Sequence, residues 1–217
     1  MPSLELAFLL FDYAAVAVFG ATGALAAARK GHDIVTFAFF AAMTGVGGGT
    51  LRDLLIGAPV FWINQPGPLL TCVAAAVVVW LVGGVHWEKG GRLKALLWLD
   101  AVGMAAYAIV GAAKALSLGV HPISAVVMGM MTATFGGVLR DVVAGEPSVL
   151  LRREIYVSAA ILGAIVFVML AGFGLDRILA GLIGFGCAFA LRAAAIRWGL
   201  AWPGFKVRDA DRGADTE

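Results

Sequence analysis

The sequence predicts an all-α integral membrane protein with seven transmembrane helices, arranged as a 3+3 inverted repeat plus one further helix. The composition, the spacing of apolar runs and an internal repeat all support this fold class. Of the 217 residues, 61% are hydrophobic and 14% are charged, whereas a typical soluble domain has about 25% charged residues. A bilayer solvates that much apolar surface, but a water-soluble fold of this size has no room to bury it. The net charge of +2 gives no indication of a nucleic-acid partner.

A helix needs about 20 mostly apolar residues to cross the hydrocarbon core of a bilayer. Seven runs in the sequence meet this requirement, and short loops with turn-forming residues separate them. The predicted spans are Leu4–Ala28, Ile34–Gly57, Pro68–Val85, Ala95–Leu118, Pro122–Gly145, Glu154–Gly174 and Ile178–Trp198. We therefore expect one transmembrane domain over residues 1–202. The polar, charged tail over residues 203–217 is expected to be cytoplasmic and disordered.

The distribution of basic residues predicts the orientation of the chain in the membrane. With seven crossings the two termini lie on opposite sides, and the side that holds the C-terminus carries nearly all of the lysines and arginines outside the spans. These residues are Arg29, Lys30, Lys89, Arg92, Lys94, Arg152, Arg153, Lys206, Arg208 and Arg212, against Arg177 on the other side. The positive-inside rule places the C-terminus in the cytoplasm and the N-terminus outside. The expected location is the plasma (inner) membrane of a bacterium or archaeon.

The sequence resembles itself at an offset of 88 residues, without a gap between Asp12 and Pro147. The matched pairs are Asp12 and Asp100, Gly23 and Gly111, Gly31 and Gly119, Thr44 and Thr132, Gly48-Gly49 and Gly136-Gly137, Arg52-Asp53 and Arg140-Asp141, Gly57 and Gly145, and Pro59 and Pro147. Each copy holds three spans, over about residues 4–85 and 92–174, and an odd number of crossings inverts the second copy. The span over about residues 178–198 lies outside the repeat.

Glycine runs in the second and fifth spans indicate where these helices kink or break. The runs are Gly47, Gly48 and Gly49 in the second span, and Gly136 and Gly137 in the fifth. Each glycine costs about 1 kcal/mol relative to alanine inside a helix, so a run of them marks a weak point. Exposed backbone groups at such a point would have to line a polar cavity or pack against protein. Close helix packing is the alternative role for these glycines.

An arginine–aspartate couple follows each glycine run, within an apolar segment. Ionisable groups near the bilayer centre cost at least ~2.5–3.5 kcal/mol and face a bundle interior or a water-filled path. We expect Arg52 to pair with Asp141, and Arg140 with Asp53, across the two repeats. The alternative is that all of these side chains extend to the headgroup region.

Three other ionisable residues complete the candidate pore-lining set, together with the repeat-related threonines Thr44 and Thr132. Asp12 and Asp100 are repeat mates that could attract cations at the two mouths of a pathway, or stabilise helix starts. Lys114 has an alanine as its repeat mate. It is expected to respond to voltage, to block a pore by pairing, or to extend its amine to the interface.

The sequence contains no motif of an enzyme, a cofactor site or a metal site. The three histidines, His32, His86 and His121, lie in loops or at span ends without metal-ligand spacing. Phosphate-binding, nucleophile-elbow and zinc-protease motifs are also absent. We therefore predict a protein that is not an enzyme, binds no cofactor, and transports passively or by coupling to ions.

The glycine and Arg–Asp motifs resemble those of the prokaryotic TRIC (trimeric intracellular cation) channel family, which overlaps bacterial sequences described as glycine transporters. The resemblance extends from Asp12 to the seventh span and includes Pro59-Val60-Phe61-Trp62, Gly145-Glu146-Pro147 and Leu151-Arg152-Arg153-Glu154. It implies a homotrimer with one hourglass pore per protomer, lined by the kinked second and fifth spans. It also implies conduction of monovalent cations, chiefly K⁺ with Na⁺ as a further candidate, and contact with membrane lipid. A secondary transporter for a small zwitterion such as glycine is the alternative, and a purely structural membrane protein is a third class.

Overall fold

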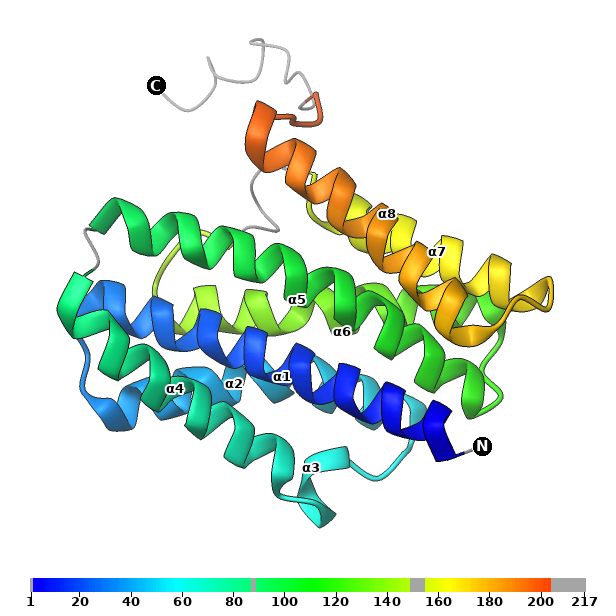
Figure 1. Cartoon of the computed structure of the whole chain (residues 1–217), viewed down its shortest axis with the longest axis horizontal. Coiled ribbons are helices and arrows are strands. Elements are labelled where there is room, and N and C mark those ends of the chain that lie inside the picture. Colours follow the sequence, from blue (N-terminus) through cyan, green and yellow to red (C-terminus); the bar gives the residue numbers. More distant parts are fainter. Residues whose placement is uncertain (1, 87–88, 149–154, 204–217) are drawn as a thin grey trace, which may run out of the picture.

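The computed structural model describes residues 2–86, 89–148 and 155–203, and every structural statement below concerns this part of the chain. All regular elements in it are helices (Figure 1). They are α1 Pro2–Lys30, α2 Ile34–Ile56, α3 Phe61–Asn64, α4 Gly67–His86, α5 Lys89–Ser117, α6 Pro122–Val143, α7 Val157–Gly172 and α8 Arg177–Trp198. Most of the predicted tail, the basic residues Arg152 and Arg153 and the neighbouring Glu154 lie outside the described residues.

Five helices are long and apolar enough to cross a membrane, and α4 and α7 contribute shorter apolar segments over Gly67–Val82 and Val157–Gly172. The prediction of an all-helical membrane protein is therefore confirmed, whereas the count of seven crossings stays a prediction. The four-residue helix α3 was not predicted. It follows Pro59 and Val60 between the second and third predicted spans, where only a short loop was expected.

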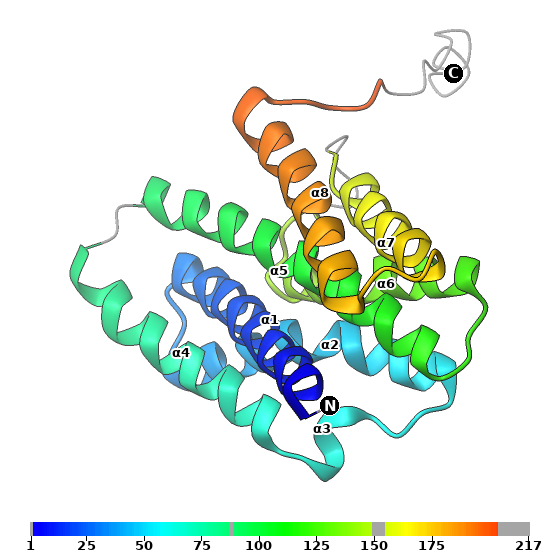
Figure 2. The ribbon, with the colours of Figure 1, turned by 45° about the vertical axis from the view of Figure 1, so that its right-hand side comes forward.

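Apart from the short helix α3, the described helices form two groups of three that pack together, and one further helix. α1 packs against α2 and α4, α5 packs against α6 and α7, and the contacts of α1 with α5 and of α2 with α6 join the groups. α8 packs on α7 and α5, and Figures 1 and 2 show α7 and α8 side by side on one flank of the bundle. This arrangement follows the predicted repeat, with α8 outside it.

The backbone at the helix ends repeats at the same offset of 88 residues. Gly31 and Gly119 have φ values of 73° and 78°, and Gly57 and Gly145 have φ values of 72° and 64°. This left-handed region strains any residue that carries a Cβ, so glycine is required at all four helix ends. The sequence repeat is therefore matched by a repeat of local structure.

Asp33 caps the start of α2 in the loop between the first two helices. The backbone N–H of Thr36 donates a hydrogen bond to Asp33 Oδ1 at 2.8 Å, and this bond lowers the pKa of that carboxyl. A charged cap at the N-terminus of a helix also interacts favourably with the helix dipole. It fixes where α2 begins.

The glycine runs bring α2 and α6 into direct backbone contact. A Cβ on Gly48 would overlap the carbonyl oxygen of Thr132, and a Cβ on Gly136 would overlap the carbonyl oxygen of Thr44. Both helices continue through their glycines without interruption. The expected break is therefore wrong for this structure, because helical hydrogen bonds satisfy the backbone and the missing side chains serve close packing. A bend at these points stays a prediction.

Candidate functional site

Two clusters of buried charges lie at the C-terminal ends of α2 and α6. The first ionic centre consists of Arg52, Asp53, Lys114, Asp12 and Phe61, and the second of Arg140, Asp141, Asp100 and Thr22. The Arg–Asp couple in each centre is almost inaccessible to solvent. Asp53 is 0% exposed and Arg140 is 1% exposed. These side chains are therefore enclosed by the protein instead of extending from its surface.

Each arginine pairs with the aspartate that follows it. Arg52 Nε and Nη2 both lie 2.9 Å from Asp53 Oδ1, and Arg140 Nε and Nη2 both lie 2.9 Å from Asp141 Oδ1. A long arginine side chain can fold back along the helix surface and reach its neighbour. The expected pairs between the repeats are therefore wrong.

The reason is the register between α2 and α6. Thr44 faces Gly136 and Gly48 faces Thr132, so the two helices run antiparallel and opposing residue numbers sum to 180. Asp141 thus lies opposite residue 39, which is 13 positions from Arg52. At a rise of 1.5 Å per residue this separation is roughly 20 Å, too far for an ion pair. The two ionic centres lie at opposite ends of the contact.

Lys114 completes the first ionic centre from α5. Its Nζ lies 2.8 Å from Asp53 Oδ1 and 2.9 Å from Asp53 Oδ2. Asp12 of α1 is close enough to interact electrostatically with Lys114 and Arg52. Lys114 is thus paired with Asp53 in the structure, whereas its role in blocking a pore or responding to voltage stays a prediction.

Helix α3 covers the first ionic centre. The Phe61 backbone N–H donates to Asp53 Oδ2 at 3.0 Å, and its ring lies 5.9 Å from the Arg52 guanidinium carbon and 5.7 Å from Lys114 Nζ. The Trp62 indole N–H donates to Thr50 Oγ1 at 2.8 Å. Phe61 and Trp62 were not among the predicted site residues, although the Pro-Val-Phe-Trp segment that contains them carried part of the resemblance.

The second ionic centre joins α6 to α5 and α1. Arg140 Nη1 donates to Asp100 Oδ1 at 2.6 Å and to Thr22 Oγ1 at 3.1 Å. Asp100 is therefore not an open mouth residue, as it was considered to be, but a buried partner of Arg140. Thr22 was missed, because nothing in its apolar surroundings distinguishes it from a threonine that bonds only to its own helix.

Gly137 leaves space beside the second ionic centre. A Cβ at this position would lie 2.9 Å from the Tyr156 hydroxyl oxygen, 3.4 Å from Asp100 Oδ1 and 3.6 Å from Arg140 Nη2. Three polar groups thus converge on a backbone position without a side chain. Tyr156, which is 1% exposed, is a further residue that the sequence did not single out.

The two candidate threonines lie at the α2–α6 contact with their hydroxyls engaged. Thr44 Oγ1 donates to the Phe40 carbonyl at 2.7 Å, and Thr132 Oγ1 donates to the Met128 carbonyl at 2.6 Å. Gly47 and Gly49 face the side chains of Leu139 and Phe61 respectively. All these residues thus lie on the stretches of α2 and α6 between the two ionic centres.

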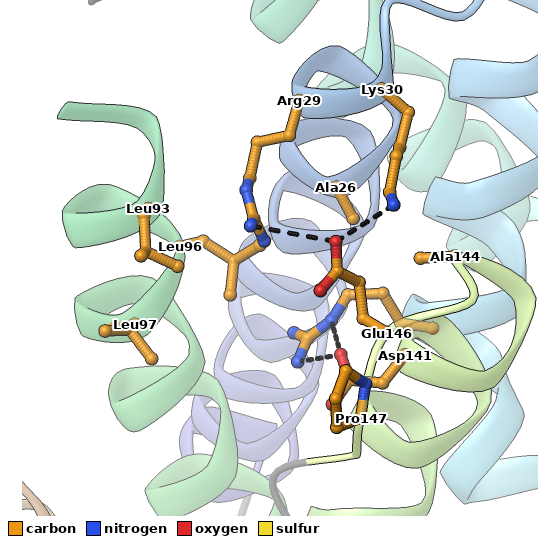
Figure 3. Close-up of a pocket in the computed structure, with 11 residues that line it drawn as sticks. Ala26, Arg29, Lys30, Leu93, Leu96, Leu97, Asp141, Ala144, Glu146 and Pro147 are labelled. Carbon is orange, nitrogen blue, oxygen red and sulfur yellow. Dashed lines mark hydrogen bonds and ion pairs between the residues drawn. The ribbon is translucent and has the colours of Figure 1, made fainter. Parts of the chain in front are cut away.

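A small cavity of about 20 Å³ reaches the second ionic centre from the surface (Figure 3). Asp141, Arg140, Ala26 and Leu96 are among its lining residues. At its rim, Lys30 Nζ lies 3.0 Å and Arg29 Nη2 lies 3.9 Å from Glu146 Oε1. A wider cleft of about 260 Å³, lined in part by the same three rim residues, adjoins it. Across the described residues, no three His, Cys, Asp or Glu side chains form a metal-binding group.

Comparison with protein families and with other protein sequences gives consistent matches. A family model described as "Glycine transporter" matches residues 9–83 and 97–172. A UPF0126 membrane protein of Vibrio cholerae is 36% identical over 208 residues, which cover 91% of this chain and 82% of that protein. The UPF0126 inner membrane protein YadS of Escherichia coli K12 is 34% identical over 203 residues, which cover 93% and 97%.

Two solved structures match over most of the fold. The TRIC trimeric intracellular cation channel orthologue from Rhodobacter sphaeroides is 48% identical, with a TM-score of 0.85 over 89% of this chain and 99% of that one. A prokaryotic TRIC channel in 0.5 M KCl is 26% identical, with a TM-score of 0.84 over 90% and 98%.

Proposed function

This chain belongs to the glycine transporter family and shares the fold of prokaryotic TRIC channels, and from its two ionic centres we propose that it is a monovalent cation channel. The observation that carries this proposal is the placement of the buried Arg–Asp couples at opposite ends of the α2–α6 contact. A buried charge in a membrane helix has a high free-energy cost, and such charges are typical of ion pathways. Since the relatives of known structure are cation channels, a pathway for cations fits these couples better than a purely structural role.

The conduction path of the proposal runs between α2 and α6 within one protomer, from the first ionic centre to the second. The described structure would be the closed state of this path, because each centre is an ion-paired cluster and the helices touch between them. Opening would bend α2 and α6 at Gly47–Gly49 and Gly136–Gly137, where helix propensity is lowest. Conduction would then exchange ion pairs within the protein for contacts with the permeating ion.

Potassium is the proposed principal ion, with Na⁺ as a further candidate. Asp53 and Asp141 supply carboxylate oxygens to a cation, whereas Arg52 and Arg140 keep each site from binding it too tightly. Conduction requires this balance, since an ion must both enter and leave.

The proposed assembly is a homotrimer in the inner membrane, with the N-terminus outside and the C-terminus cytoplasmic. The relative from Rhodobacter sphaeroides is described as trimeric, and YadS as an inner membrane protein. Arg29, Lys30 and Arg92 gather at one end of the bundle around a single cleft. This end would face the cytoplasm and the anionic headgroups of the membrane lipid.

A transporter of a small zwitterion is the second candidate, favoured by the pairing of carboxylate and guanidinium groups in each centre. The two functions are separated by measurements on the same purified protein. Unitary currents in a planar bilayer with potassium chloride, without saturable uptake of labelled glycine by proteoliposomes, support the channel. Saturable uptake without unitary currents would replace the channel with the transporter.

A further inference from the structure

The small cavity and the wider cleft beside it share a boundary of charged side chains. Arg29, Lys30 and Glu146 line both, whereas Arg140 and Asp141 line the small cavity but not the cleft. The three shared residues therefore lie between the second ionic centre and the cleft. Figure 3 shows the Glu146 carboxylate between the basic end of α1 and Asp141.

Ion pairs join the shared residues to one another. Glu146 Oε1 lies 3.0 Å from Lys30 Nζ and 3.9 Å from Arg29 Nη2. The backbone of Glu146 is held at the end of α6, because its N–H donates to the Asp141 carbonyl at 2.9 Å. The side chain thus ties the end of α6, in the second repeat, to the end of α1, in the first.

With these pairs in place the cavity is too small for a hydrated ion. Its volume is about 20 Å³, and roughly 10–15 Å³ measured in this way holds one water molecule. An ion with a single shell of water needs several times this volume. Passage from the cleft to the buried Arg–Asp couple therefore requires the end of α6 to move away from α1, which breaks the pairs.

The contact has no equivalent at the other end of the path. The three charged residues have uncharged repeat mates, which are Ser117, Leu118 and Ala58. The first ionic centre is covered by α3 instead. A contact that the repeated framework needed for folding would be expected in both copies, so the ionic contact belongs to the second end alone.

The ion pairs are suited to a contact that opens and closes. The side chains of Lys30 and Glu146 are 39% and 28% exposed, so water and salt weaken their attraction. A partly exposed pair of this kind contributes little to the stability of a fold, and thermal motion breaks it readily.

We propose that Glu146, Lys30 and Arg29 form an ionic latch, which closes the second ionic centre to the cleft and opens before an ion passes. The proposal rests on the proposed function for the identity of the ion. The latch itself is a barrier to any small solute, so its opening is measurable without currents.

The reactivity of a cysteine behind the latch tests the proposal. Cys72→Ala and Cys187→Ala remove the native thiols, and Ala26→Cys places one in the small cavity. The neutral reagent methyl methanethiosulfonate would be added to the purified protein, and its reaction followed by mass spectrometry. Glu146→Gln and Lys30→Met should each raise the reaction rate, by about two- to ten-fold, because each breaks the latch.

The two variants change the local charge in opposite directions, which separates the latch from electrostatics. A more positive surrounding favours the reactive thiolate, so charge alone would make Glu146→Gln faster and Lys30→Met slower. Exchanging the charges, with Lys30→Glu and Glu146→Lys together, should return the rate toward the wild-type value. Unchanged rates in both single variants, or changes of opposite sign, would overturn the latch.

Two controls lie at the same end of the bundle. Asp33→Asn removes a negative charge outside the rim and retains the cap of α2, so the Ala26→Cys rate should not change. His32→Cys is exposed and should react equally fast with the latch intact or broken. If Ala26→Cys does not fold, Ala144→Cys lines the same cavity from the end of α6 and should give the same order of rates.

The outcomes also separate the latch from the channel. Unitary currents in a protein whose cysteine reactivity ignores both variants would remove the latch and leave the channel intact. Reactivity that follows the latch, in a protein without currents, would establish the barrier and remove the channel.

Discussion

Gly48 of α2 lies against the carbonyl oxygen of Thr132 so closely that a methyl group on the glycine would overlap it. The mirror contact joins Gly136 to the carbonyl oxygen of Thr44. Two helices from different repeats thus meet backbone to backbone, midway between two buried ionic centres. Each centre and the contact between them gives a separate prediction.

Gly48→Ala and Gly136→Ala should destabilise the fold and reduce conduction, because the added methyl group pushes the helices apart. Overpacking of this kind typically costs 1–3 kcal/mol, or roughly 2–10 °C in the unfolding midpoint of a domain of this size. Gly186→Ala is the control, since a Cβ there meets nothing within 4 Å. A Gly186 variant as unstable as the Gly48 variant would argue against the backbone contact.

Asp53→Asn should change the conductance strongly, because it removes the charge that holds both Arg52 and Lys114. Arg52 and Lys114 would then face only Asp12 at one end of the path and repel the permeating ion. Single-channel recording measures the effect. Asp176→Asn is the matched control, since Asp176 caps α8 at the surface and asparagine caps a helix equally well. Wild-type currents in the Asp53 variant would remove that residue from the pathway.

Arg140→Met should destabilise the protein by about 3–5 kcal/mol, since it leaves Asp100 and Asp141 buried without their cation. Combining it with Asp100→Asn should recover part of the loss, because one buried charge is then neutral. Thermal unfolding of the single and double variants tests both statements. An additive loss in the double variant would mean that the ion pair with Asp100 does not stabilise the fold.

Trp62→Phe should loosen α3 over the first ionic centre, because it deletes the bond from the indole N–H to Thr50 Oγ1. A hydrogen bond of this kind contributes about 1 kcal/mol, so the open probability should change by roughly five-fold. Trp198→Phe, at the exposed end of α8, is the control. If α3 covers the path, only the Trp62 variant should alter gating.

The sequence predicted helix positions and buried charges correctly where placing a residue type in the membrane has a large free-energy cost. Seven of the eight helices lie where apolar runs predicted them, and the Arg–Asp couples are buried as the insertion cost requires. The pairing of those couples was not predictable, because the register between α2 and α6 depends on which glycine meets which threonine. The short helix α3 was also missed, since four residues give no periodicity. Thr22 and Tyr156 were not predicted as site residues, because their contacts with the second ionic centre form only when helices distant in sequence pack together.

The position of Lys114 illustrates the same limit. Its missing repeat mate was visible in the sequence, and pairing was one of three roles considered for it. That Asp53 is its partner depends on how α5 packs beside α2. Asymmetry between repeats thus identified an important residue, but only the packing identified its function.

The reversal potential of the wild-type protein in a planar bilayer, under a tenfold gradient of potassium chloride, tests the central claim most directly. Conduction of K⁺ through the path between α2 and α6 predicts unitary currents with a reversal potential of about 59 mV. Its polarity should be the one that opposes the flow of K⁺ down its concentration gradient. The same currents should be lost or strongly reduced in Gly48→Ala, whereas Gly186→Ala should retain them. A reversal potential near zero or of the opposite sign, or a bilayer that shows no unitary currents, would contradict the account.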